Sequence, residues 1–111
     1  MTPRLKAEIW VKAHIRRCFV EGSFAAVVRR GDEMAGTVLL KLNDLGGGCI
    51  VLQPTANPDG GRLWMRGTGP TPVAEAEADA YIQKQLRYDP DIWVLEIEDR
   101  EGRHFLDEPV A

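Results

Sequence analysis

The apolar residues of this chain recur with two different periods, and that change of period limits the folds open to it. Near the N-terminus they stand at every second position: Leu5, Ala7, Ile9 and Val11. Further along they stand at every fourth position: Ala74, Ala78, Ile82 and Leu86. The first spacing places side chains on one face of a strand, and the second places them on one face of a helix. The sequence therefore predicts a domain that mixes strands and helices.

The N-terminal region has two competing interpretations. In the first, a strand over residues 4–11 is followed by a short helix over residues 13–21, which ends at Gly22 because glycine readily adopts the left-handed conformation that closes helices. In the second, one continuous helix begins at Leu5. Further strands are expected over residues 24–30, 37–43, 49–53, 62–66 and 92–98, with a short closing strand over 104–106. Since the strands between residues 24 and 53 are separated only by turns, we expect an antiparallel meander there.

The second helix has clear boundary signals. Thr71 is a favourable N-cap, and Pro72 suits the first helical position. Pro90 cannot continue a helix, so we expect the helix to end by about Tyr88. The fold class expected is α+β: a single domain over residues 1–111, with a mixed or mostly antiparallel sheet of five to six strands packed by two helices. Residues 106–111 are expected to form a loose tail.

Composition excludes several functional classes. The formal net charge of −3 over 111 residues argues against general binding to nucleic acid or to anionic membranes. The early apolar residues are interrupted by Arg4, Lys6 and Glu8, so no secretory signal segment is recognised. Two cysteines do not make a disulfide framework. We therefore expect a cytoplasmic protein.

The best small-ligand candidate is the turn before the second helix. It comprises Arg66, Gly67, Thr68, Gly69 and Thr71. Glycines let the backbone approach an anion closely, and helix N-termini favour negative charge. The turn lacks the lysine and hydroxyl pattern of a P-loop, and two prolines remove backbone donors. An ordinary strand-to-helix turn is the alternative interpretation.

A second group of residues suits an interaction surface. Arginines and exposed aromatic side chains are common anchors in protein interfaces. The candidates are Arg16, Arg17, Arg30, Trp10 and Trp64. Packing beneath a helix is the alternative for Trp10, and ordinary solvent exposure is the alternative for the arginines. An open sheet also leaves edge strands, which allows a homodimer.

Reactive groups are few. His14 and Cys18 are four residues apart and would share a helix face, but a zinc site would need distant ligands such as Cys49 and His104. The single serine, Ser23, has no nucleophile-elbow sequence around it. We therefore predict no metal, no cofactor and no catalytic residues.

Three segments resemble a known family. They read Glu8-Ile9-Trp10-Val11-x-Ala13-x-x-Arg16-Arg17-Cys18, then Ala26-Val27-Val28-Arg29-Arg30-Gly31-Asp32, then Ala35-Gly36. Together they resemble a family of short uncharacterised bacterial proteins of about this length. The resemblance implies an intact single-domain protein and supplies no activity. The leading hypothesis is a small non-catalytic cytoplasmic module that binds a protein partner or a second copy of itself. The alternative is an anion- or nucleotide-binding domain, enzymatic or not, that uses the turn at residues 66–71.

Overall fold

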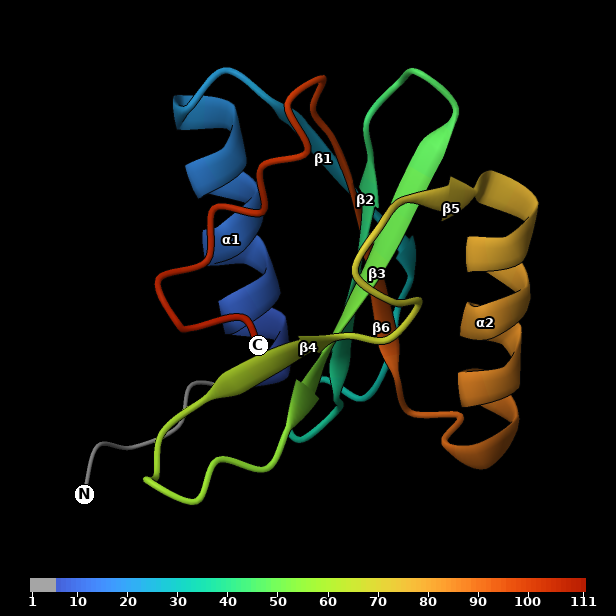
Figure 1. Ribbon diagram of the computed structural model, residues 1–111. Coiled ribbons are helices and arrows are strands. Elements are labelled where there is room, and N and C mark those ends of the chain that lie inside the picture. The colour runs from blue at the N-terminus through green and yellow to red at the C-terminus, as the bar shows by residue number, and fades with distance from the viewer. Residues whose placement is uncertain (1–5) are drawn as a thin grey trace.

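Two helices cover opposite faces of one mixed β-sheet in the computed structural model, which describes residues 6–111 (Figure 1). The elements in chain order are α1 (Ala7–Val20), β1 (Phe24–Arg29), β2 (Val38–Asn43), β3 (Gly48–Thr55), β4 (Leu63–Arg66), β5 (Val73–Ala74), α2 (Glu75–Tyr88) and β6 (Trp93–Glu98). This architecture confirms the expected α+β class, with a six-stranded mixed sheet and two helices in a single domain.

The strand order of the sheet is β1-β6-β2-β3-β4, and β5 pairs with β3. The pair β2–β3 is antiparallel, so the expected meander is confirmed for these two strands, and β3–β4 is antiparallel as well. The expectation is wrong for β1 and β2, because β6 lies between them, antiparallel to β1 and parallel to β2. The parallel pair requires a crossover, which α2 provides.

Each face of the sheet has its own hydrophobic core. The α1 face holds the larger cluster, which includes Val11, Leu40, Trp64, Trp93 and Ile97. The α2 face holds a smaller one: Leu39, Cys49, Val51, Ala78, Ile82, Ile92 and Val94. The central strands contribute to both clusters, which explains their near-continuous apolar sequences.

The strand expected over residues 4–11 is wrong, and the continuous helix is the observed structure; residues 4 and 5 lie outside the described part. Ala7, Val11, His14 and Cys18 are buried, and their spacing of three or four residues places them on one helical face. Ile9, which belonged to the alternating pattern, is 50% exposed. Burial follows the helical period here because α1 packs its whole length against the sheet (Figure 1). Over residues 6–111, neither helix is long and apolar enough to cross a membrane.

The second helix ends at Tyr88 as expected, but it does not begin at Thr71. Val73 and Ala74 first pair with Cys49 and Gly48 as β5, and the helix starts at Glu75. Ala74 occupies the N-cap position without a side-chain hydrogen bond. The cap prediction was wrong because sheet pairing of these residues delays the helix by one turn.

The C-terminal segment is held against β4 and α1. The Trp64 N–H donates to the Pro109 carbonyl, and the Ala111 N–H donates to the Trp64 carbonyl. His14 Nε2 lies 2.8 Å from the His104 carbonyl oxygen. The expectation of a strand over residues 104–106 was therefore wrong, and the loose tail expected over 106–111 stays a prediction beside the two backbone hydrogen bonds between residues 109–111 and Trp64. An irregular segment replaces the strand because side chains of α1 bind its carbonyl groups.

Candidate functional site

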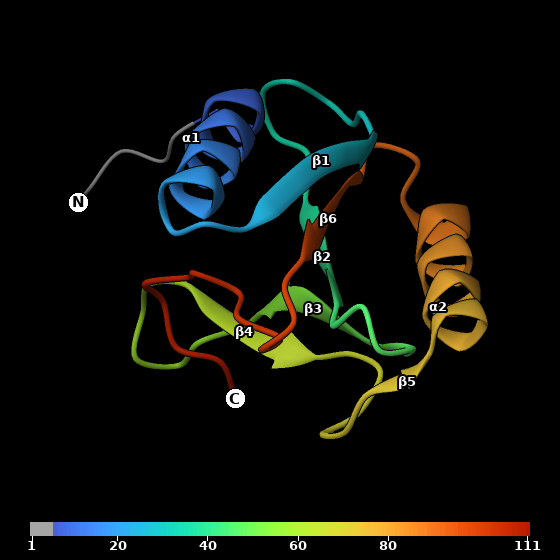
Figure 2. The same ribbon diagram turned by 90° about the horizontal axis from the view of Figure 1, so that it is seen from above.

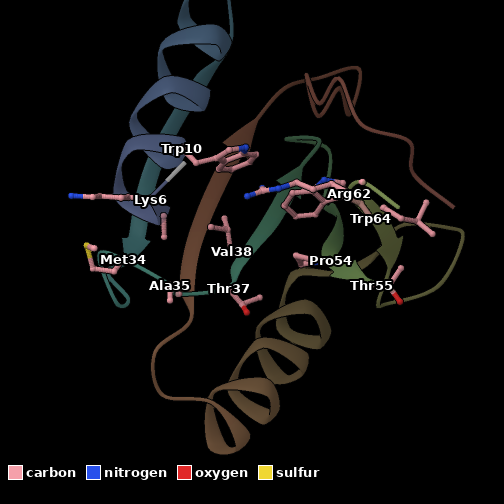
Figure 3. Close-up of a pocket in the computed structure, with 14 residues that line it drawn as sticks. Lys6, Trp10, Met34, Ala35, Thr37, Val38, Pro54, Thr55, Arg62 and Trp64 are labelled. Carbon is pink, nitrogen blue, oxygen red and sulfur yellow. The ribbon is translucent and has the colours of Figure 1, made fainter. Parts of the chain in front are cut away.

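A cavity of about 530 Å³ opens at the end of the molecule where α1 begins (Figure 3). Its walls come from the start of α1, the segment 34–38, the end of β3 and the residues that open β4. The volume falls within the range of about 300–1,000 Å³ that is typical of ligand pockets. We call it the Trp10 cleft after the indole that forms part of its wall.

The Trp10 cleft carries positive charge. Of its lining residues, all of which lie within the described part of the chain, two are ionised at neutral pH: Lys6 and Arg62. Thr37 and Thr55 add hydroxyl groups, and most of the other lining groups are apolar. A cationic cleft in a chain of net charge −3 indicates a local concentration of positive potential.

Aromatic stacking shapes one wall of the cleft. Trp10 stacks on Trp64 with ring centroids 5.7 Å apart, and on His14 at 4.8 Å. The Arg62 guanidinium lies 5.4 Å from the centroid of the Trp10 ring, in a cation–π arrangement. Trp64 is fully buried and donates from Nε1 to Glu108, whereas Trp10 is half-buried. In Figure 3, Arg62, Trp10 and Trp64 lie near one another, whereas Lys6 and Met34 lie on the other side of the view, with the Lys6 amine directed away from Arg62.

Backbone hydrogen bonds fix the opposite wall. The N–H groups of Ala7 and Glu8 donate to the carbonyls of Met34 and Glu33 at 3.3 and 3.1 Å. These bonds attach the 33–36 segment to the first turn of α1 and occupy donors that a helix N-terminus usually leaves free. The backbone N–H groups of Ala7 and Glu8 are therefore not free to bind an anion in the cleft.

The structure brings together two of the five residues expected to form an interaction surface. Trp10 and Trp64 stack and both line the cleft. Arg17 instead donates to the Phe105 carbonyl and pairs with Asp107, while Arg30 pairs with Glu8. Arg16 is exposed on α1. The role of these arginines in binding stays a prediction.

The turn at residues 66–71 is tied to its neighbours. The Thr68 hydroxyl accepts a 3.1 Å hydrogen bond from the Val51 N–H, and Arg66 donates to the Ala111 carbonyl at 2.8 Å. Two of the glycine N–H groups in the turn donate to carbonyls of Val51 and Arg66. Residues 66–71 line neither the Trp10 cleft nor a smaller hollow of about 220 Å³ beside Pro72. Anion binding by this turn stays a prediction.

The histidine and cysteine of α1 are both buried and favour uncharged forms. Burial lowers the pKa of His14 and raises the pKa of Cys18 to about 11. Cys49 lies in the other core cluster. Within residues 6–111, no group of three or more His, Cys, Asp or Glu side chains could hold a metal ion. His14 and Cys18 both lie on the buried face of α1, and His14 bonds the His104 carbonyl.

A buried lysine on the α2 face is another polar feature. Lys41 is 5% exposed, and its Nζ lies 2.8 Å from carboxylate oxygens of both Glu75 and Asp79. Burial lowers the pKa of Lys41, but the carboxylates of Asp79 and Glu75 outweigh it and raise the pKa well above its ordinary value. A lysine that stays protonated is not a nucleophile. This cluster instead attaches α2 to β2.

Sequence reasoning missed Lys6 and Arg62 as site residues. The cleft draws on four separated parts of the chain, around residues 6–10, 34–38, 54–55 and 61–64. No local motif links them. The one local signal was the Arg62-x-Trp64 spacing, which places both residues on the same side of a strand.

Comparison with known proteins identifies the family. The family model described as "Protein of unknown function (DUF1491)" matches residues 5–107. The crystal structure of a DUF1491 family protein from Caulobacter crescentus CB15 is 47% identical, with a TM-score of 0.88 over 97% of this chain and 100% of that one. A solution structure of a protein from A. tumefaciens is 31% identical, with a TM-score of 0.78 over 98% of this chain and 100% of that one. No curated protein matches this chain. The chain belongs to the DUF1491 family, whose function is not established.

Proposed function

We propose that this protein is a non-catalytic binding module whose ligand site is the Trp10 cleft. Its ligand would carry a carboxylate or phosphate next to an apolar or aromatic group. The observation that carries this proposal is the lining itself: the two ionised side chains, Lys6 and Arg62, are both cationic, and an indole lies beside them.

The geometry of Arg62 supports recognition of an anion. A guanidinium presents several donors in a rigid fork that fits a carboxylate or phosphate. Stacking on Trp10 restricts the Arg62 side chain before any ligand arrives, which reduces the entropy lost on binding. The half-buried indole also offers an apolar surface to the rest of the ligand.

The lining of the cleft supports binding over catalysis. General acid–base catalysis uses His, Asp, Glu, Lys, Cys or Tyr side chains within hydrogen-bond reach of the substrate. Of these types, the lining residues, which all fall within residues 6–111, include Lys6 and no second acid or base that could exchange a proton with it. Thr37 and Thr55 would need an adjacent base to act as nucleophiles.

A thermal-shift screen tests the proposal. The panel contains inorganic phosphate, nucleotides, aliphatic dicarboxylates and an aromatic carboxylate, together with the amide of that aromatic acid as an uncharged control. A ligand present at about a hundred times its Kd should stabilise the folded state by about 2.7 kcal/mol. We expect an anionic member of the panel to shift the unfolding temperature, and the matched amide to bind at least about tenfold more weakly.

Two variants locate the site. Arg62→Gln should abolish the shift because it removes the cation stacked on Trp10. Arg16→Gln removes the same charge from an exposed position of α1 outside the cleft, and it should keep the shift. A panel without any shift, or equal loss in both variants, would refute the proposed site.

We also place this module in the cytoplasm of a bacterium. The free buried thiols of Cys18 and Cys49 support a reducing compartment. The matching proteins from C. crescentus and A. tumefaciens support a bacterial source. Cell fractionation with detection of the native chain tests the compartment, and recovery in a secreted fraction would contradict it.

A further inference from the structure

The two edges of the sheet differ in how they are covered (Figure 2). At the β4 edge, residues 109–111 run beside Trp64 and exchange two backbone hydrogen bonds with it. At the opposite edge, β1 pairs with β6 on one side, and its other side pairs with no strand in the described part of the chain. An edge of this kind offers unpaired N–H and C=O groups to another strand.

The uncovered edge is also apolar. Large hydrophobic side chains on β1 and on the end of α1 beside it are 42–76% exposed: Phe19, Val20, Phe24, Val27 and Val28. Phe19 and Phe24 meet edge to face with ring centroids 5.8 Å apart. Residues 24–28 contain neither a charged residue nor a proline, and the protective features of this edge strand are limited to its last residue, Arg29, and a bulge at Val28. Contiguous exposed apolar surface is typical of an interaction site.

We propose that β1 pairs antiparallel with β1 of a second copy of this chain, with Ala26 of each copy at the two-fold axis. A β-bulge sets the register, because Val27 pairs with Leu95 and Arg29 with Val94, which leaves Val28 without a partner residue in β6. If the bulged Val28 is left out of the count outward from Ala26, Phe24 of one copy faces Arg29 of the other.

The side chains are complementary in this register. Phe24 pairs with Glu98 and Arg29 pairs with Val94 in β6, and these β6 positions are an even number of residues apart. Phe24 and Arg29 therefore occupy the same face of the sheet. The Arg29 guanidinium of the second copy donates to the Ile92 carbonyl of its own chain at 2.8 Å, and in the dimer it would exchange that bond for contact with the Phe24 ring and, one strand further, the Glu98 carboxylate. The two-fold axis repeats this contact, and the small Ala26 lets the strands approach at the centre.

The covered β4 edge explains why the assembly would stop at two copies. A sheet with two open edges can add copies without end, whereas pairing of one open edge with itself closes after a single step. Within residues 6–111, β1 is the open edge longer than two residues, because the other strand without an outer partner, β5, comprises two residues. The Trp10 cleft does not contribute to the pairing, so the dimer and the proposed function are independent.

Measurement of molar mass by light scattering and analytical ultracentrifugation tests this inference. The wild-type chain should have the mass of two copies at concentrations that approach the millimolar. Val28→Glu should raise the dimer dissociation constant about tenfold or more, because it places a charge at an apolar interface. Ile9→Glu is the matched control: Ile9 is 50% exposed on α1 outside the group at β1, and its substitution should leave the dissociation constant unchanged.

A charge exchange tests the register. Arg29→Glu and Glu98→Arg should each weaken the dimer, and the double variant should restore it, while circular dichroism verifies that each variant is folded. Hydrogen exchange of the β1 amides should slow as the wild-type concentration rises. The mass of one chain at the highest concentration, or equal effects of Val28→Glu and Ile9→Glu, would overturn the inference.

Discussion

Replacement of Asp99 with alanine tests whether one buried carboxylate joins three parts of this fold. Asp99 directly follows β6 and is 6% exposed. Its Oδ1 accepts hydrogen bonds from the Ser23 hydroxyl at 2.6 Å and from an Arg103 guanidinium nitrogen at 2.8 Å. Its Oδ2 accepts one from the Arg103 backbone N–H at 2.8 Å. The carboxylate thus connects the α1–β1 turn, the end of β6 and the turn that starts the C-terminal segment.

The magnitude follows from what the substitution leaves behind. Breaking a buried charge pair by removal of one partner costs about 3–5 kcal/mol. The Arg103 side chain is 44% exposed, so water compensates it and the lower end of that range applies. Ser23 is 7% exposed, so the substitution leaves its hydroxyl without a partner, at a cost of about 1–3 kcal/mol. The range for breaking the buried charge pair already includes this cost. We expect Asp99→Ala to lower the free energy of unfolding by about 3 kcal/mol.

Urea denaturation followed by tryptophan fluorescence measures this loss. Asp107→Ala is the control, because Asp107 pairs with Arg17 while its side chain is 78% exposed, and such a pair contributes about 0.5 kcal/mol or less. The Arg103 guanidinium and the Ser23 hydroxyl hold the pKa of Asp99 well below its usual range. Its stabilisation is therefore present above an unfolded pKa of about 3.9 and is lost as the pH falls further. A loss under about 1 kcal/mol, or one equal to the control, would refute the reasoning.

Three further predictions follow from buried groups. Burial lowers the pKa of His14, so the free energy of unfolding should fall as the pH drops below about 6.5. His14→Gln should flatten the dependence of the urea midpoint on pH, and an unchanged slope contradicts this. Burial raises the pKa of Cys18 to about 11, so iodoacetamide should label it slowly in the folded chain and readily in urea; rapid labelling of the folded chain contradicts this. In Gly31→Ala the new Cβ would meet the Asp91 carbonyl oxygen, so the substitution should cost about 2 kcal/mol or more in urea denaturation. In Gly46→Ala the new Cβ would lie 3.5 Å from Asp44 Oδ1, an ordinary van der Waals contact, so this substitution should cost under about 0.5 kcal/mol, and equal losses would contradict the steric argument.

Local patterns predicted elements in which one face shows a single hydrophobic period, even where the opposite face is buried as well, as in β2. The helix that ends at Tyr88 has Ala78 and Ile82 buried four residues apart, and Pro90 follows its end. In β2, the alternating Val38, Leu40 and Leu42 all lie in the core of the α1 face. Pattern and structure agree in these segments because each face of the element meets one environment.

The N-terminal helix shows where such reasoning fails. Ile9 and Val11 fit an alternating pattern, and Ala7 and Val11 fit a helical one, so residues 5–11 satisfy both periods. The residues that distinguish them are His14 and Cys18, which continue the helical face and are buried although one of them is polar. Because histidine is polar, an analysis of hydrophobic periodicity does not detect a histidine on the buried face. Its partner, the His104 carbonyl, lies ninety positions away in the chain.

The Trp10 cleft could not be predicted for a related reason. Sequence analysis named Trp10 and Trp64 as interface anchors on the condition that they are exposed, with packing as the alternative for Trp10, and in the structure Trp64 is fully buried and Trp10 is half-buried. Their stacking depends on the β3–β4 hairpin folding back beneath α1, and this also brings Arg62 to the Trp10 ring. A tertiary contact of this kind does not correspond to any fixed spacing of residues in the sequence.

The position of β6 connects the topology with the proposed dimer. The run from Phe24 to Val28 has the composition of an interior strand, which is buried on both faces and paired on both sides. Because β6 enters between β1 and β2, β1 lies at the edge, and helix α2 packs over β3 and β2 instead of over β1. The composition of β1 therefore fits an interior strand, whereas its position is at the edge of the sheet, where Val28 is 59% exposed. Pairing with a second copy would give β1 the second neighbouring strand that its sequence suits. In a strictly monomeric protein these apolar side chains would remain in water, and charged residues at the edge would avoid that cost.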